Sequence, residues 1–205
     1  SSMLRDIFII FRNKNFSSIV ILDMAVGGIG SITATLLLVT YTYFWQLDAV
    51  QTSLLFAGPI LLAALVSTTF SGLLNRLLEK QQILRLTCAL TSINLIWLTP
   101  LKLFDLLPDN NTLVFALICV NWAVHMTMTI LRVITVHSLL ADIVDEQELV
   151  TGQRQEGIIF AVAFFSSKFM GAVGYVIAGP LLDLIGLQAG AQPGEVPSTV
   201  IWGLG

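Results

Sequence analysis

The amino-acid sequence predicts an all-α membrane protein with several transmembrane helices. Of its 205 residues, 56% are hydrophobic and only 11% are charged, whereas soluble domains carry about 25% charged residues. The apolar residues form five long runs that do not alternate with polar residues, as the strands of a transmembrane β-barrel would. These observations exclude an ordinary soluble enzyme, a disordered chain and a disulfide-rich secreted module. The net charge of −3 argues against a nucleic-acid partner.

The five apolar runs are the predicted spans, each near or above the roughly 20 residues that a transmembrane helix needs. They cover about 16–45, 51–73, 83–101, 111–139 and 157–187. Residues 1–15 form an amphipathic lead-in without the cleavage site of a signal peptide. Residues 188–205 are expected to be an extracytoplasmic loop followed by the start of a truncated sixth span. Six spans would make one half of a twelve-span transporter built from repeats.

The distribution of basic residues predicts the orientation, because cytoplasmic loops carry an excess of lysine and arginine. The connections and the overlapping span ends carry only Lys102 on one side. On the other side, with the second connection taken as about 74–85, they carry Arg5, Arg12, Lys14, Arg76, Lys80, Arg85 and Arg154. We therefore expect the N-terminus in the cytoplasm and the protein in the plasma (inner) membrane.

Four polar or charged residues inside the predicted spans are the first candidates for function. They are Asp23, His125, Arg132 and Lys168. A charge at the centre of a transmembrane helix costs about 2.5–3.5 kcal/mol on insertion scales. Because lipid does not offset that cost, these side chains are expected to face a cavity or one another.

The fourth span carries a polar stripe. At about 100° per residue, Asn121, His125 and Arg132 fall within about 40° of one another on a helical wheel. One interpretation is the wall of a hydrated pathway for substrate or coupling ion. The other is a polar contact between helices, which would hide the same stripe. His137 lies on a different face and is expected to be an interface residue.

Lys168 lies roughly 18 Å beyond the start of the fifth span, too deep for its side chain to return the charge to an interface. Phe164 and Tyr175 share its helix face, and aromatic rings beside a cation suit a ligand pocket. Lys168 is therefore predicted to act in substrate binding or coupling. The nearby small residues are instead predicted to serve helix packing: they are Gly171, Gly174, Ala178 and Gly179.

Asp23 and Arg132 are predicted to pair. Each lies about seven residues from the cytoplasmic end of its span, so both are roughly 10 Å deep. A carboxylate and a guanidinium at equal depth would relieve each other's desolvation. The alternative is that each is hydrated separately in the cavity.

The most charged stretch, ADIVDEQELVTGQRQEG, connects the fourth and fifth spans. Asp142 and Asp145 are three residues apart and share a face if the helix continues, and Glu148 extends that face. Arg154 and Glu156 follow. The plain interpretation is a solvated loop, but an excess of acids also predicts basic partners, and few are left in this sequence.

The same stretch, read on as ADIVDEQELVTGQRQEGIIFAVAFFSSK, resembles the glycoside–pentoside–hexuronide:cation symporter family of the major facilitator superfamily. The family pattern is A-D-x-x-D, a few residues, then G-x-R-x-E and an apolar helix. It is matched in order and spacing by Asp142, Asp145, Gly152, Arg154 and Glu156. Lys168 also stands at a position where a member of the family has a lysine.

The resemblance implies that the five spans are helices seven to eleven of twelve, from the C-terminal six-helix half of a sugar–cation symporter that works by alternating access. It implies a sugar or glycoside substrate, Na⁺ or H⁺ as coupling ion, no other cofactor, and cation ligands in the missing N-terminal half. It also implies a cytoplasmic gate between the halves, formed by Asp142, Asp145, Glu148, Arg154 and Glu156.

Two alternatives stay open at this point: a major facilitator transporter of a non-sugar organic solute, and a non-transporting membrane scaffold. A channel is disfavoured because no selectivity sequence is seen. An enzyme is not expected, because neither a metal-binding motif nor a nucleophile motif occurs in the sequence. Cys88 and Cys119 lie at different depths and are expected to be packing residues rather than a disulfide.

Overall fold

The computed structural model describes residues 8–187, 196–197, 200 and 203, so the expectations for the first seven residues and most of those for the sixth span lie outside it. Regular structure in this part is entirely helical. Its elements are α2 (Lys14–Val39), the π-helical turn η1 (Thr40–Phe44), α3 (Ala49–Leu77), α4 (Lys80–Ile96), α5 (Leu98–Leu103), α6 (Asn111–Thr151) and α7 (Glu156–Leu184).

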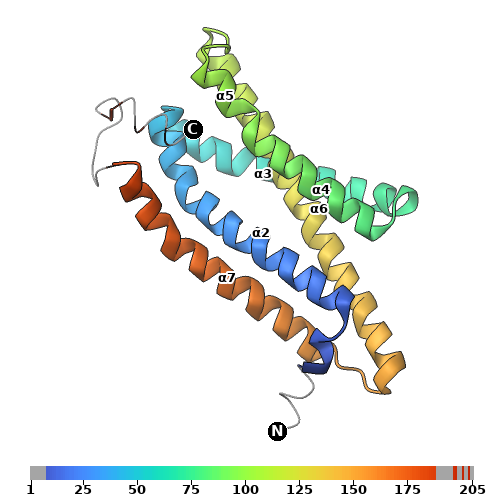
Figure 1. Ribbon diagram of the computed structural model, residues 1–205. Helices are drawn as coiled ribbons and strands as arrows, with labels where there is room; N and C mark the ends of the chain where they lie inside the picture. Colours follow the sequence, from blue (N-terminus) through green and yellow to red (C-terminus); the bar gives the residue numbers. More distant parts are fainter. Residues whose placement is uncertain (1–7, 188–195, 198–199, 201–202, 204–205) are drawn as a thin grey trace. The chain divides into compact units, whose positions relative to one another are not determined.

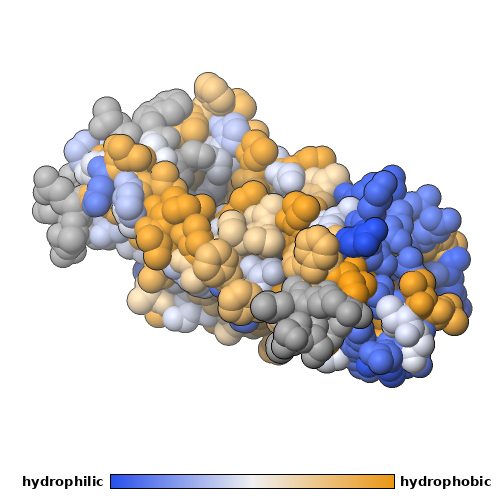
Figure 2. Space-filling view, turned by 60° about the horizontal axis from the view of Figure 1, so that its bottom comes forward, coloured by the Kyte–Doolittle hydropathy of each residue, from blue (hydrophilic) through white to orange (hydrophobic). Residues whose placement is uncertain are grey.

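Five helical stretches in the described part are long and apolar enough to cross a membrane. They are Lys14–Phe44, Ala49–Leu77, Lys80–Leu103, Asn111–Thr151 and Glu156–Leu184. The predicted fold class, an all-α membrane protein with five transmembrane helices, is thereby confirmed. Figure 2 shows one face of the molecule, on which hydrophobic side chains cover broad areas while hydrophilic ones gather in one region.

The fourth spanning helix continues beyond the apolar run that predicted it. The run ends near residue 139, but α6 extends to Thr151. Residues 140–151 are interrupted by acidic side chains but contain good helix formers and neither glycine nor proline. The acidic residues Asp142, Asp145 and Glu148 therefore lie on a helix rather than in a loop, and their spacing places them on one face.

The third spanning stretch is interrupted at Trp97. This residue ends α4 and begins α5, and it keeps helical dihedral angles, φ −68° and ψ −32°. Pro100 explains the interruption, because proline has no N–H to donate to the carbonyl four residues earlier. The first spanning stretch likewise changes hydrogen bonding at its end, where the Trp45 N–H donates to the Thr40 carbonyl at 3.0 Å.

The chain divides into two compact units. One contains α2, the end of α6 from His137 onward, and α7; the other contains η1, α3, α4, α5 and α6 as far as Val136. In the first unit α2 and α7 lie side by side (Figure 1).

Small residues bring α2 and α7 together. A Cβ added at Gly27 would lie 3.3 Å from Oγ of Ser167, and one at Gly171 would lie 3.1 Å from Oγ of Ser31. A Cβ at Gly174 would lie 2.9 Å from the Ser31 Cβ and closer still to the Gly28 carbonyl oxygen. At Gly174 these distances leave no room for a Cβ, and at Gly27 and Gly171 a Cβ would be a tight fit. The two backbones therefore approach closely, as small-residue interfaces allow.

The packing role predicted for the small residues of α7 holds at three of the four positions. Gly171 and Gly174 contact α2, and Ala178 is fully buried. Gly179 is exposed, and a Cβ there would meet nothing within 4 Å. Within the described part of the chain, Gly179 therefore makes no packing contact, contrary to the prediction.

Candidate functional site

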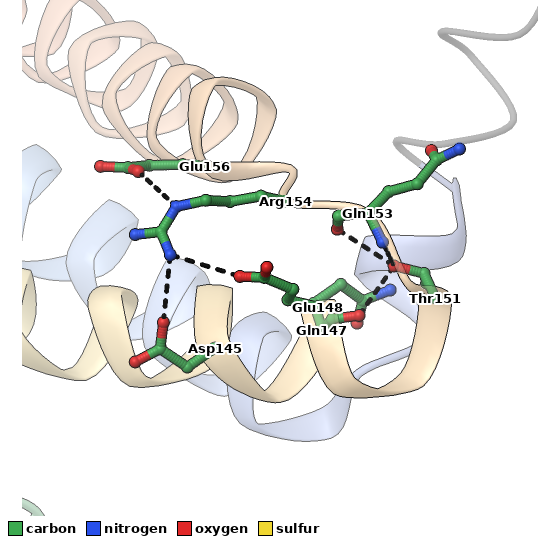
Figure 3. Close-up of polar contacts among 7 residues, drawn as sticks. All are labelled: Asp145, Gln147, Glu148, Thr151, Gln153, Arg154 and Glu156. Carbon is green, nitrogen blue, oxygen red and sulfur yellow. Dashed lines mark hydrogen bonds and ion pairs between the residues drawn. The ribbon is translucent and has the colours of Figure 1, made fainter.

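The turn between α6 and α7 holds a cluster of charged side chains centred on Arg154 (Figure 3). Its Nε donates to Oε2 of Glu156 at 3.1 Å, and its Nη1 donates to Oε2 of Glu148 at 3.3 Å. The same Nη1 lies 3.8 Å from Oδ1 of Asp145. One arginine thus joins carboxylates from the end of α6 and the start of α7. Four of the five predicted gate residues are brought together here; Asp142 lies one helical turn before Asp145 on the same face.

Local backbone features shape this turn. Gly152 has φ +69°, a conformation that glycine adopts without strain, and its N–H donates to the Glu148 carbonyl at 2.8 Å. This is the αL motif that commonly ends a helix. The Thr151 hydroxyl accepts from the Gln153 N–H at 3.3 Å and donates to the Gln147 carbonyl at 2.8 Å. The chain therefore reverses tightly enough for Arg154 to reach back to Glu148.

The cluster contributes little to stability, because its side chains are exposed. The Arg154 side chain is 57% exposed and that of Asp145 is 71% exposed, and water and salt screen exposed ion pairs so that they add little to stability. The hydrogen bond to Glu156, followed by the charges of Glu156, Glu148 and Asp145, raises the pKa of Arg154. Three carboxylates around one cation leave an excess of negative charge that is open to a basic partner.

Lys168 lies near the middle of α7, on an exposed face of the helix. Lys168, Phe164 and Tyr175 are all exposed. Within the described residues, Lys168 forms no ion pair or hydrogen bond. The structure thus brings together the three candidates of the fifth span and leaves the lysine available to a group outside the described part.

His137 belongs beside this face, although the sequence suggested no special role for it. Its ring lies 5.4 Å from that of Phe164 and 6.5 Å from that of Phe160, both edge-on. These contacts place α6 along one side of the Lys168 face. Phe160 and Phe164, one turn apart on α7, are the residues in the sequence that could have suggested an aromatic contact. The position of His137 on the helical wheel does not show which residues it contacts.

In the second unit, the members of the polar stripe on α6 have different surroundings. The Asn121 side-chain oxygen accepts from Nε1 of Trp97 at 2.8 Å, and its main-chain carbonyl accepts from Nδ2 of Asn94 at 3.0 Å. Asn121 therefore makes the polar contact between helices that was one of the two interpretations of the stripe. The indole of Trp97 and the amide of Asn94 could not be anticipated as its partners from the periodicity of α6 alone.

His125 lies in a cluster of aromatic rings. Its imidazole stacks on Trp122 with centroids 5.3 Å apart and an interplanar angle of 12°. Trp122 in turn meets Tyr41 and Phe56 edge-on at 6.3 and 5.6 Å. Among the described residues, Nδ1 of His125 and Nε1 of Trp122 are buried without a hydrogen-bond partner. An unsatisfied buried group costs about 1–3 kcal/mol, so a polar partner for either nitrogen would stabilise this cluster.

Arg132 and Asp23 are each half-buried. Arg132 belongs to the same unit as His125 and Cys88. Asp23 belongs to the other unit, and its pairing with Arg132 stays a prediction.

The ends of η1 and α5 carry another polar feature that the sequence did not reveal. Nζ of Lys102 donates to the Phe44 carbonyl and lies 5.0 and 4.9 Å from the ring centroids of Phe44 and Trp45. A cavity of about 490 Å³ adjoins it. Such contacts fix the end of the first spanning stretch against α5.

The described residues show no metal centre: no group of three or more His, Cys, Asp or Glu side chains in this part could hold an ion. Cys88 and Cys119 are both free thiols, as expected for packing residues.

Comparison with known proteins identifies one family. A family model described as MFS/sugar transport protein matches residues 1–205. No curated protein and no solved structure matches the chain.

Proposed function

The chain belongs to the MFS/sugar transport protein family of major facilitator transporters, and on this basis we propose that it forms half of a secondary active transporter for a sugar or glycoside. The proposed coupling ion is Na⁺ or H⁺, and the proposed mechanism is alternating access. Within the superfamily, the charged turn around Arg154 favours the glycoside–pentoside–hexuronide:cation symporters. The proposed location is the plasma (inner) membrane, with the first described helix starting at the cytoplasmic side.

The observation that carries this proposal is the position of Lys168. An exposed lysine near the middle of α7 lies about 18 Å from Glu156 and about 24 Å from Leu184 along the helix, beyond the reach of snorkelling. Such a charge is tolerated only beside water, ligand or a counter-charge. Phe164 and Tyr175 on the same face would stack against a sugar ring, while the lysine donates to its hydroxyl groups.

His125 and Trp122 support a second contact with substrate. Their unpartnered nitrogens suit the hydroxyl groups of a sugar, because each hydroxyl both donates and accepts. Arg132 and Asp23 are proposed to couple substrate transport to the movement of the cation. A passing cation would change the electrostatic interactions of these two charged side chains. Asn121 would hold α6 against α4 and thus position His125 one turn further along.

The function is tested by uptake into vesicles that contain the full-length protein. Labelled glycosides should accumulate above the outside concentration when a Na⁺ or H⁺ gradient is imposed, and should equilibrate only when the gradient is dissipated. Equilibration without accumulation under every gradient would indicate a uniporter. Accumulation of a different class of organic solute would replace the sugar, and absence of any flux would favour a membrane scaffold.

We further propose that the exposed acids of the Arg154 cluster form the cytoplasmic gate, by attracting basic residues of the other half. Replacing Asp142 and Asp145 together with asparagine should weaken that attraction and open the cytoplasmic side. The measurement is labelling of a cysteine introduced in the central cavity, which should become several-fold faster from the cytoplasm. In the proposed closed gate these acids would pair with basic residues between the two halves. Removing one partner of a buried pair costs about 3–5 kcal/mol, which would be enough to reverse a two-state preference.

Glu146→Gln provides the control for the gate. It removes a negative charge from the same turn of α6 but leaves the contacts of Arg154 intact. Its labelling rate should match that of the parent. Equal acceleration in the control and the double variant would show that total charge, rather than this face of α6, sets the equilibrium.

A further inference from the structure

An open groove of about 440 Å³ lies where the segment before α2 meets the end of α6. Its lining is mixed, with basic, amide, acidic and apolar side chains. The lining residues are Ile9, Arg12, Asn13, Lys14, Asn15, Glu146, Gln147 and Val150. All belong to one compact unit. The charged turn around Arg154 does not use this groove.

The segment before α2 is folded, which fixes the groove. Ile10 is buried, and the ring of Phe11 packs edge-on against buried Phe16 at 5.5 Å. The Asn13 side chain accepts from the N–H groups of Asn15 at 2.9 Å and Phe16 at 3.2 Å, and so caps α2. Arg12 and Lys14 flank this cap and therefore project from a fixed piece of backbone.

The charges of the groove favour an anion. Arg12 and Lys14 are both exposed, and within the described residues neither makes an ion pair. Glu146 adds one negative charge, so the lining carries a net positive charge. The remaining lining groups are amides and apolar side chains, which add no charge. An anionic group between Arg12 and Lys14 would gain two charge-assisted hydrogen bonds.

The apolar residues around the groove favour a lipid rather than a soluble anion. Phe8 is 69% exposed, Leu149 is 89% exposed and Val150 is 78% exposed. They come from both segments that form the groove. A soluble phosphate would leave these side chains in water, whereas acyl chains and the glycerol region of a phospholipid would cover them.

The position along the helix agrees with that occupant. The first membrane-spanning stretch begins at Lys14. Arg12 and Lys14 are therefore expected at the level of the lipid head groups, whether this end of the helix lies on the cytoplasmic or the opposite side of the membrane. Basic residues at this level attract anionic lipids, and aromatic residues such as Phe8 are typical of the interface. We propose that the groove binds the head group of an anionic phospholipid, with its phosphate between Arg12 and Lys14.

The proposal is tested by the thermal stability of the full-length protein in detergent with added lipid. Phosphatidylglycerol should raise the melting temperature more than phosphatidylcholine with the same acyl chains. Native mass spectrometry should show tighter binding of phosphatidylglycerol. In Arg12→Gln/Lys14→Gln that binding should weaken roughly tenfold or more, since each basic residue near a membrane contributes several-fold. Arg76→Gln/Arg85→Gln, which removes the same charge elsewhere, should keep it.

A second variant is expected to change lipid binding in the opposite direction, which misfolding could not explain. Glu146→Gln removes the acid from the groove and should strengthen binding of phosphatidylglycerol. Equal binding of the two lipids by the parent would overturn the proposal. So would an equal loss of phosphatidylglycerol binding in Arg12→Gln/Lys14→Gln and in Arg76→Gln/Arg85→Gln. Inorganic phosphate that competes fully with phosphatidylglycerol would show a soluble-anion site instead and would also overturn it.

Discussion

Gly174→Ala is expected to destabilise the protein by about 1–3 kcal/mol, as overpacking of a close interface does. The new Cβ would lie 2.9 Å from the Cβ of Ser31 and closer to the Gly28 carbonyl oxygen. Neither neighbour has a flexible end that could swing aside. The backbone of α2 or α7 must therefore shift at this point. The measurement is the melting temperature in detergent, which should fall by several degrees.

Gly179→Ala is the matched control for this substitution. Gly179 lies on the same helix, but a Cβ there would meet nothing within 4 Å. Because alanine favours a helix by about 1 kcal/mol over glycine, this variant should be as stable as the parent or slightly more so. Equal losses in both variants would show that glycine is needed in α7 for a reason other than contact with α2.

Lys168→Ala should reduce gradient-driven uptake by about tenfold to hundredfold, because a hydrogen bond from a charged group is worth about 1.5–3 kcal/mol. The protein should still insert and fold, since Lys168 is exposed and makes no ion pair or hydrogen bond within the described part of the chain. The measurements are initial uptake rates and the amount of folded protein in the membrane. The loss belongs to transport only if the amount is unchanged.

Lys168→Arg separates charge from geometry. If only the positive charge matters, arginine should restore most of the uptake. If the side chain must donate to a substrate hydroxyl group at a fixed distance, uptake should stay low. Uptake at the parent's rate in Lys168→Ala would remove Lys168 from the binding and coupling residues. The proposed role of the α7 face would then have to rest on Phe164 and Tyr175.

The periodicity and composition of the sequence were enough to predict the helices and which residues share a helix face. The apolar runs predicted five spanning helices, and the 3.6-residue repeat placed Phe164, Lys168 and Tyr175 on one side of the last of them. All three lie on the exposed side of α7. Such properties depend on residues close together in the chain, so a single sequence contains them.

The end of α6 shows where hydrophobicity misleads. The apolar run predicts where the membrane ends, whereas the helix ends where Gly152 adopts a positive φ. Asp142, Asp145 and Glu148 thereby remain on the helix, and Arg154 reaches back across the turn to Asp145 and Glu148. The glycine was visible in the sequence, but its role as the stop signal required the observed backbone.

Which neighbour each face meets was decided only by the tertiary structure. Gly174 and Gly179 look alike in the sequence, yet only Gly174 meets α2. Asn121 and His125 share a stripe on α6, yet Asn121 bonds to Trp97 while His125 stacks on Trp122. The partners Gly28 and Trp97 lie far from these residues in the chain. The sequence by itself therefore determined the helices and their faces, because both arise from local periodicity, and the packed structure decided the contacts, because they depend on how distant segments fit together.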